Sequence, residues 1–238
     1  MRRALFLTLL VWQSWTHAAS ESVALIEAGI NTQDAASIQR GAGLFVNYCL
    51  SCHKATYMRY NRLTDTGLSE DQIKASLIFD DSTKVGDVMT NGLDPVGAKA
   101  MFGVAPPDLS VISRSRGVDW LYTYFLSFYK DESTVTGWNN TLFPNVAMSH
   151  VFAAQQGEQV LVIDEEHHSQ PQLKLAVEGT MSPDQYKQMI RDLVNYLAFM
   201  GEPAAEKRKQ IGSVVLIFLI LFAFLAWALK REFWKEIH

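Results

Sequence analysis

The stretch Cys49-Leu50-Ser51-Cys52-His53 holds both cysteines of the chain and a histidine directly after the second one. Residues three and four apart share one face of a helical turn, so both sulfurs and the imidazole can approach one bound group from the same side. The pattern C-x-x-C-H is the attachment sequence of a c-type haem. The sequence therefore predicts one covalently attached haem c, with thioether bonds at Cys49 and Cys52 and with His53 as an iron ligand.

The cysteine pair could also serve a chemistry other than haem attachment. Two cysteines in an exported protein can form a disulfide, a thioredoxin-like redox pair or half of a zinc site. A zinc site needs two more ligands, and the chain contains no further cysteine. A thioredoxin motif would follow a strand, whereas the residues before Cys49 have a helical pattern. The histidine after the second cysteine favours haem.

A helix is expected to lead into this motif. Thr32 or Asp34 can cap it, and its apolar residues continue through Phe45 to the first cysteine. Gly41 and Gly43 lower the helix propensity of this segment. We interpret the two glycines as positions that permit close packing against another helix.

A second helix is predicted near the end of the exported part. Ser182-Pro183-Asp184-Gln185 has the pattern of a capping box with proline at the first helical position. An apolar stripe with a period near 3.6 residues follows, and Gly201 and Pro203 end it. The first and last helices of small c-type cytochromes cross one another, and these two predicted helices resemble that pair.

The two ends of the chain indicate export and membrane attachment. Residues 1–18 combine a basic start, a short apolar run and small residues, which is typical of a secretory signal peptide. Residues 211–229 are uncharged and would form a helix about 30 Å long, which matches the hydrocarbon core of a bilayer. We therefore expect a periplasmic domain at 19–203, a transmembrane helix at 204–230 and a cytoplasmic tail at 231–238, with a single pass through the inner membrane.

Composition and charge exclude several classes of protein. The 238 residues are 48% hydrophobic and 19% charged, which does not fit a disordered or collagen-like chain. A net charge of −4 argues against nucleic acid as a partner. Residues 20–203 contain 22 acidic and 13 basic side chains, a net charge of −9. This charge suits a basic partner, with Asp80-Asp81 and Asp164-Glu165-Glu166 as candidate patches, and it equally suits simple solubility.

The second axial ligand of the iron is less well determined. Methionine gives a high-potential carrier, histidine a lower potential, and an empty position suggests catalysis. With the initiator methionine and the predicted last helix of the domain excluded, the candidates are Met58, Met89, Met101, Met148, Met181, His150, His167 and His168. Met58 lies too close to His53 in sequence, His167 and His168 lie in a polar stretch, and His150 is expected to be structural or exposed. Met148 and Met181 remain as equal choices.

Three further motifs follow the haem motif in order. They are Pro106-Pro107-Asp108-Leu109-Ser110, Arg114-Ser115-Arg116-Gly117 and Phe143-Pro144-Asn145-Val146-Ala147-Met148. Together with the signal peptide and the single C-terminal anchor, this order resembles the cytochrome c1 family. That family supplies the haem subunit of the quinol–cytochrome c oxidoreductase complex.

The resemblance implies a role for particular residues. It assigns the covalent and proximal haem contacts to the residues of the opening motif, Cys49, Cys52 and His53. It places the methionine ligand on Met148 rather than Met181. It also implies that Arg116, or else its neighbour Arg114, binds a haem propionate, and a guanidinium suits a carboxylate through bidentate hydrogen bonds.

The resemblance also implies the fold and the activity. We expect a mostly α fold, a class I cytochrome c core with long loops, plus one C-terminal transmembrane helix. A small hairpin is predicted at residues 160–163 and 173–177. The haem would take electrons from a Rieske iron–sulfur protein and pass them to a soluble cytochrome c. A cytochrome b subunit and the lipid bilayer are the other expected partners, and the chain itself is not an enzyme.

Two alternatives belong to other classes of function. One is a different membrane-bound c-type electron carrier, such as a cytochrome linked to an oxidase. The other is a haem enzyme with an open sixth coordination position, which would bind carbon monoxide or cyanide readily.

Overall fold

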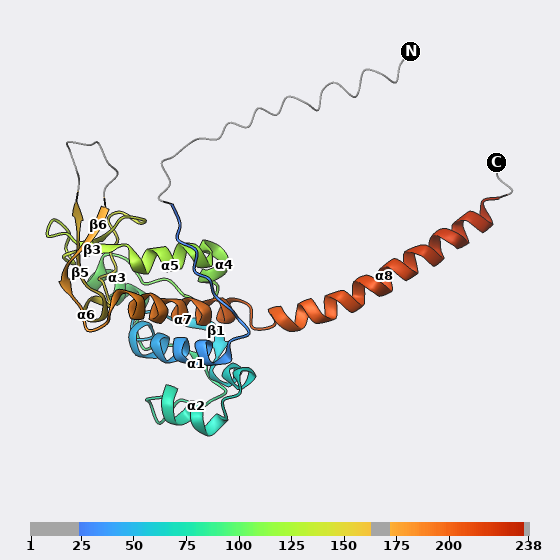
Figure 1. Cartoon of the computed structure of the whole chain (residues 1–238). Helices are drawn as coiled ribbons and strands as arrows, with labels where there is room; N and C mark the ends of the chain where they lie inside the picture. Colours follow the sequence, from blue (N-terminus) through green and yellow to red (C-terminus); the bar gives the residue numbers. More distant parts are fainter. Residues whose placement is uncertain (1–23, 163–171, 236–238) are drawn as a thin grey trace, which may run out of the picture.

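The haem-motif helix and the last helix of the domain, α1 (Ala35–Leu44) and α7 (Pro183–Gly201), lie side by side at the centre of the fold (Figure 1). The computed structural model describes residues 24–162 and 172–235. The expected signal peptide at 1–18, the acidic patch at 164–166 and the histidines at 167 and 168 lie outside the described residues. Helices α4 (Ile112–Arg116) and α5 (Val118–Leu126) pack on α7 as well.

Short helices and three two-stranded antiparallel sheets surround this helical centre. The remaining helical elements are η1 (Phe45–Cys49), η2 (Tyr60–Thr66), α2 (Glu70–Leu77), α3 (Pro95–Phe102), α6 (Ala153–Gln156) and α8 (Ala205–Phe233). The strands are β1 (Ala55–Arg59), β2 (Val88–Met89), β3 (Phe128–Lys130), β4 (Trp138–Asn140), β5 (Gly157–Val162) and β6 (Gln172–Glu178). The predicted mostly helical fold is confirmed.

Helix α1 begins as the sequence predicts, and its two glycines behave differently. The side chain of Asp34 accepts a hydrogen bond from the backbone N–H of Ser37 and caps the helix. A Cβ atom on Gly41 would lie 2.1 Å from the carbonyl oxygen of Asp192 in α7, so only glycine fits there. A Cβ on Gly43 would meet nothing within 4 Å. The packing role is confirmed for Gly41 and wrong for Gly43, which faces away from α7.

Helix α7 follows its predicted pattern closely. Both hydrogen bonds of the capping box between Ser182 and Gln185 are present, and the helix ends at Gly201. The predicted apolar stripe is buried along its whole length, at Tyr186, Met189, Ile190, Leu193, Val194, Leu197 and Met200. This stripe forms a large part of the hydrophobic core and fixes α7 against α1.

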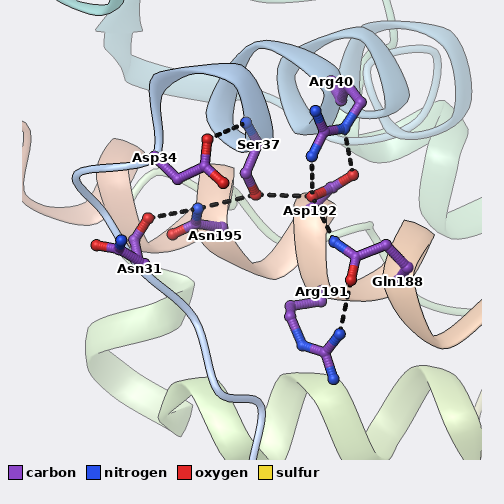
Figure 2. A network of polar contacts seen from close by, with 8 residues as sticks. All are labelled: Asn31, Asp34, Ser37, Arg40, Gln188, Arg191, Asp192 and Asn195. Carbon is purple, nitrogen blue, oxygen red and sulfur yellow. Dashed lines mark hydrogen bonds and ion pairs between the residues drawn. The ribbon is translucent and has the colours of Figure 1, made fainter.

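A polar network crosses the interface between α1 and α7 (Figure 2). At its centre lies Asp192, which is 4% exposed. Its carboxylate accepts hydrogen bonds from Ser37 Oγ at 2.7 Å, from Arg40 Nε at 2.6 Å and from Gln188 Nε2 at 3.1 Å. The amide of Asn195 donates to Ser37 Oγ and to the carbonyl of Asn31. Side chains of the two crossing helices therefore provide the hydrogen-bond donors to the buried carboxylate of Asp192.

The sheets are only partly those expected from the sequence. The predicted hairpin is confirmed as β5 and β6, which pair from Gly157 opposite Glu178 to Val162 opposite Gln172, while residue 163 lies outside the described residues. The pairs β1–β2 and β3–β4 form in stretches that were expected to be loops. Strands of two to five residues are too short to show a period-two pattern, so no sequence pattern indicated them.

Helix α8 extends away from the rest of the chain (Figure 1). It contains the uncharged residues 211–229 and continues to Phe233, slightly beyond the predicted segment. Its apolar window is not buried against any described part of the chain. An exposed apolar helix of this length is long enough to cross a membrane once.

Candidate functional site

The haem motif begins where the first helix changes its hydrogen bonding. Helix α1 continues into the π-helical turn η1, whose last residue is Cys49, and the N–H of Leu50 donates to the carbonyl of Phe45. The N–H groups of Cys52 and His53 then both donate to the carbonyl of Cys49, at 3.1 and 2.7 Å. Short π-helical segments are frequent at functional sites. This turn holds both cysteines and the histidine within one tight loop.

Both cysteines are free thiols, so the disulfide alternative is not what the structure shows. Cys49 is 6% exposed, and burial raises the pKa of its thiol to about 12. Cys52 is half-buried. Two free thiols beside a histidine fit the covalent attachment of a porphyrin.

The imidazole of His53 is oriented by a backbone carbonyl. Its Nδ1 lies 2.8 Å from the carbonyl oxygen of Pro107, so Nδ1 carries the proton and donates it there. The lone pair of Nε2 is then free for a metal. Burial is the largest effect on this side chain and lowers the pKa of His53, which favours the neutral form that ligates iron. The chemistry of this donor set fits a c-type haem.

The segment that carries Pro107 is tied to the haem motif. The N–H of Leu109 donates to the carbonyl of Lys54 at 2.8 Å. The carboxylate of Asp108 accepts from the N–H and the hydroxyl of Thr56, at 3.0 and 2.8 Å. These bonds fix the carbonyl that orients His53, which gives a local reason for the Pro106-Pro107-Asp108-Leu109-Ser110 motif.

Met148 lies on the loop that follows β4. Its sulfur accepts a hydrogen bond from the hydroxyl of Tyr124 in α5 at 3.5 Å, and its side chain packs against the core. Among the other methionines, Met101 is 71% exposed. Met89 is fully buried, and its sulfur is hydrogen-bonded to Tyr196 at 3.0 Å. Met148 is thus a half-buried thioether on a loop, with a defined partner.

The two candidate arginines point in different directions. The guanidinium carbon of Arg116 lies 5.0 Å from the ring centroid of Trp120, and Trp120 in turn stacks on Tyr124. Arg116 is therefore in the same group of side chains as Met148. The stem of Arg114 lies instead beside Gly201 at the end of α7.

The predicted site residues thus fall into two groups. One holds Cys49, Cys52 and His53 with the carbonyl of Pro107, and the other holds Met148 and Arg116 around Tyr124. The chain from Asp108 to Tyr124 connects them through α4 and α5. No contact described above joins His53 directly to Met148.

His150 belongs to the core rather than to the surface. It is 5% exposed, and its ring stacks on Phe128 at 4.8 Å and meets Trp138 edge-on at 5.0 Å. Burial lowers the pKa of its imidazole to about 4. Of the two expectations for this residue, the structural one holds and the exposed one is wrong.

Sequence reasoning missed two residues of the second group. Tyr124 and Asn140 had no motif of their own, although both are buried polar residues in short elements. Asn140 precedes the turn-forming Phe143-Pro144-Asn145, and an asparagine before such a turn commonly bonds to its backbone. That pattern could have indicated Asn140. Nothing in the sequence indicated Tyr124.

Comparisons with known proteins relate the chain to one family. The model of the Cytochrome C1 family matches residues 26–237. The cytochrome c1 of Allochromatium vinosum is 42% identical over 245 residues, which cover 100% of both chains. A Nitrosomonas europaea protein named ammonia monooxygenase gamma subunit is 45% identical over 238 residues, 100% of this chain and 99% of that protein. A chain of a solved hyperthermophilic respiratory Complex III is similar with a TM-score of 0.42 and 18% identity, over 85% of this chain and 77% of that one.

Proposed function

The chain belongs to the cytochrome c1 family, and we propose that it receives electrons from a Rieske iron–sulfur protein and passes them to a soluble c-type cytochrome. Members of this family are the haem subunit of complex III. The chain is accordingly an electron-transfer subunit with one covalently attached haem c, anchored by a single helix, and it is not an enzyme in itself. The identities of the electron donor and the electron acceptor are what we propose beyond the family assignment.

Five residues would hold the haem. Cys49 and Cys52 would form the thioether bonds, His53 Nε2 and Met148 Sδ would ligate the iron, and Arg116 would offer its charge to a propionate. The bound group supplies a one-electron Fe(II)/Fe(III) couple. The observation that carries the assignment of His53 is the bond from its Nδ1 to the carbonyl of Pro107, because it leaves Nε2 free as a ligand.

The placement in the membrane follows from the two ends of the chain. With the signal peptide at 1–18, the domain at 19–203 lies on the periplasmic side of the inner membrane. The transmembrane segment at 204–230 then leaves the tail at 231–238 in the cytoplasm. The exposed apolar face of α8 suits lipid and a cytochrome b subunit as neighbours.

The acidic surface of the domain suits a basic electron acceptor. Asp80 accepts hydrogen bonds from Ser82 and Thr83, which hold the pKa of its carboxyl below the ordinary value, so it stays charged. Neutralising Asp80 and Asp81 together, or residues 164–166, should reduce the salt dependence of electron transfer to the acceptor. An unchanged salt dependence in both variants would contradict acidic docking.

The axial ligand is tested by redox titration of the haem in wild type, Met148→Leu and Met181→Leu. We expect a high midpoint potential in wild type, because methionine ligation favours the ferrous state. It should fall sharply in Met148→Leu and stay unchanged in Met181→Leu. The reverse result would assign the ligand to Met181.

The assembly is tested by purification of the tagged full-length chain from membranes. We expect a cytochrome b and a Rieske protein to accompany it. Recovery with subunits of an oxidase or a monooxygenase instead would contradict the proposed partners. Ready binding of carbon monoxide or cyanide by the wild type would indicate an open sixth position and a haem enzyme.

A further inference from the structure

We infer that Tyr124 positions the sulfur of Met148 and raises the midpoint potential of the haem through its hydroxyl. This inference rests on the proposed ligation by Met148 and goes beyond it, because neither the family match nor the sequence motifs assign Tyr124 any role. It is a positioning residue, since it acts through Met148.

The hydroxyl of Tyr124 is buried and needs an acceptor. The residue is 8% exposed, so water does not serve as the partner of its hydroxyl. A buried O–H nearly always donates to something. The acceptor in the described structure is Met148 Sδ, at an oxygen–sulfur distance of 3.5 Å.

The ring of Tyr124 cannot easily turn away from the sulfur. It stacks on Trp120 with centroids 5.1 Å apart and an interplanar angle of 12°. Phe125 and Phe128 meet it edge-on, with centroids at 5.4 and 5.0 Å. Offset and edge-on aromatic pairs of this kind are favourable beyond the area that they bury. The hydroxyl is therefore presented in one direction.

One side chain fixes both partners of this bond. The amide of Asn140 donates from Nδ2 to the carbonyl of Tyr124 at 2.7 Å. Its Oδ1 accepts from the N–H groups of Leu142 and Phe143, which begin the loop that leads to Met148. The separation of the hydroxyl and the sulfur is thus set by a common buried element.

The consequence for the haem is electronic. A thioether sulfur has two lone pairs, and one of them accepts the hydrogen bond from the hydroxyl of Tyr124 while the other would remain for the iron. Hydrogen bonding withdraws electron density from the sulfur and makes it a weaker donor. Weaker donation by the sulfur reduces the stabilisation of the ferric state more than that of the ferrous state. Hydrogen bonds to ligands tune metal centres in this way. The bond should therefore raise the potential.

The test compares Tyr124→Phe with Tyr186→Phe in the full-length holoprotein. Both changes remove one buried hydroxyl, but that of Tyr186 donates to the carbonyl of Phe125 at 2.9 Å rather than to a sulfur. We expect Tyr124→Phe to lower the midpoint potential, so that the ratio of reduced to oxidised haem falls severalfold at a fixed solution potential. The methionine-to-iron charge-transfer absorption should persist. Tyr186→Phe should leave the potential unchanged.

The possible failures are distinguishable. An unchanged or raised potential in Tyr124→Phe, or an equal fall in Tyr186→Phe, overturns the role of Tyr124 and leaves the proposed function intact. If Met148→Leu keeps the charge-transfer absorption, the proposed ligation fails and the inference fails with it. If Tyr124→Phe alone loses that absorption, the hydroxyl is needed to keep the sulfur on the iron, which supports the positioning role.

Discussion

Asn140 joins the backbone of Tyr124 to the loop of Met148 through a single amide. Its Nδ2 lies 2.7 Å from the carbonyl oxygen of Tyr124, and its Oδ1 lies 2.9 Å from the nitrogen of Leu142. The side chain is 0% exposed, so water cannot replace these bonds. Asn140 therefore ties the loop that bears the proposed iron ligand to helix α5.

We expect Asn140→Ala to destabilise the protein and to disturb the methionine ligand. It leaves the N–H groups of Leu142 and Phe143 without this acceptor and removes one of the two donors to the carbonyl of Tyr124, at a cost of about 2–3 kcal/mol in the free energy of unfolding. Asn47→Ala is the control, because its amide bonds to the carbonyl of Gly43 at an exposed position and should cost under about 0.5 kcal/mol. Denaturant unfolding gives both values, and equal losses would contradict the role of Asn140.

Gly41 and Gly43 provide a matched pair within one helix. Gly41→Ala places a methyl group 2.1 Å from the carbonyl oxygen of Asp192 and should cost about 3 kcal/mol, because α1 and α7 must separate. Gly43→Ala meets nothing and should stabilise the helix by up to about 1 kcal/mol. The unfolding temperatures of the two variants should therefore shift in opposite directions from that of the wild type. A shift of the same sign in both would show that the crossing tolerates a wider spacing.

The buried charge of Asp192 should matter far more than an exposed ion pair. Asp192→Asn leaves the guanidinium of Arg40 without its carboxylate and should cost about 2–3 kcal/mol. Asp65→Asn breaks the ion pair with Arg62, which is partly open to water, and should cost at most about 1 kcal/mol. The comparison is made by denaturant unfolding. Similar losses would mean that solvent reaches the network of Figure 2.

The sequence predicted those features that local chemistry determines. The cap at Ser182, the end of α7 at Gly201 and the tight turn from Cys49 to His53 all depend on residues within four positions of one another. Such patterns can be recognised in a sequence because hydrogen bonds and helix periodicity act at short range.

The second half of the site depends on distant residues and could not be predicted in the same way. The bond from Tyr124 to Met148 spans 24 positions, and Asn140 bonds to a carbonyl 16 positions away. The residues alone did not distinguish Met148 from Met181 as the second iron ligand, because no residue close to either one indicates such a role. Only the family resemblance favoured Met148. Gly43 shows a second limit of prediction from sequence. The residue type alone does not indicate which face of the helix a glycine occupies, so the close packing predicted for Gly43 was wrong.

The carboxylate of Asp108 should make part of the stability depend on acid. Partial burial alone would raise its pKa, but hydrogen bonds from Ser110 and Thr56 outweigh burial and hold the pKa below its ordinary 3.8. A carboxyl whose pKa is lower in the folded state binds fewer protons there, so its contribution is complete above about pH 4 and is lost as the pH falls through the folded value. Because the group is mostly exposed, this contribution is at most about 1 kcal/mol.

We therefore expect Asp108→Asn to be less stable than wild type at pH 6 and closer to wild type near pH 2, well below the ordinary pKa of 3.8, where the wild-type carboxyl takes up a proton. Denaturant unfolding of the holoprotein at the two pH values measures the difference. A deficit of the same size at both would show that Asp108 acts through its shape and not through its charge. In that case the segment that holds the carbonyl of Pro107 against His53 would be insensitive to acid.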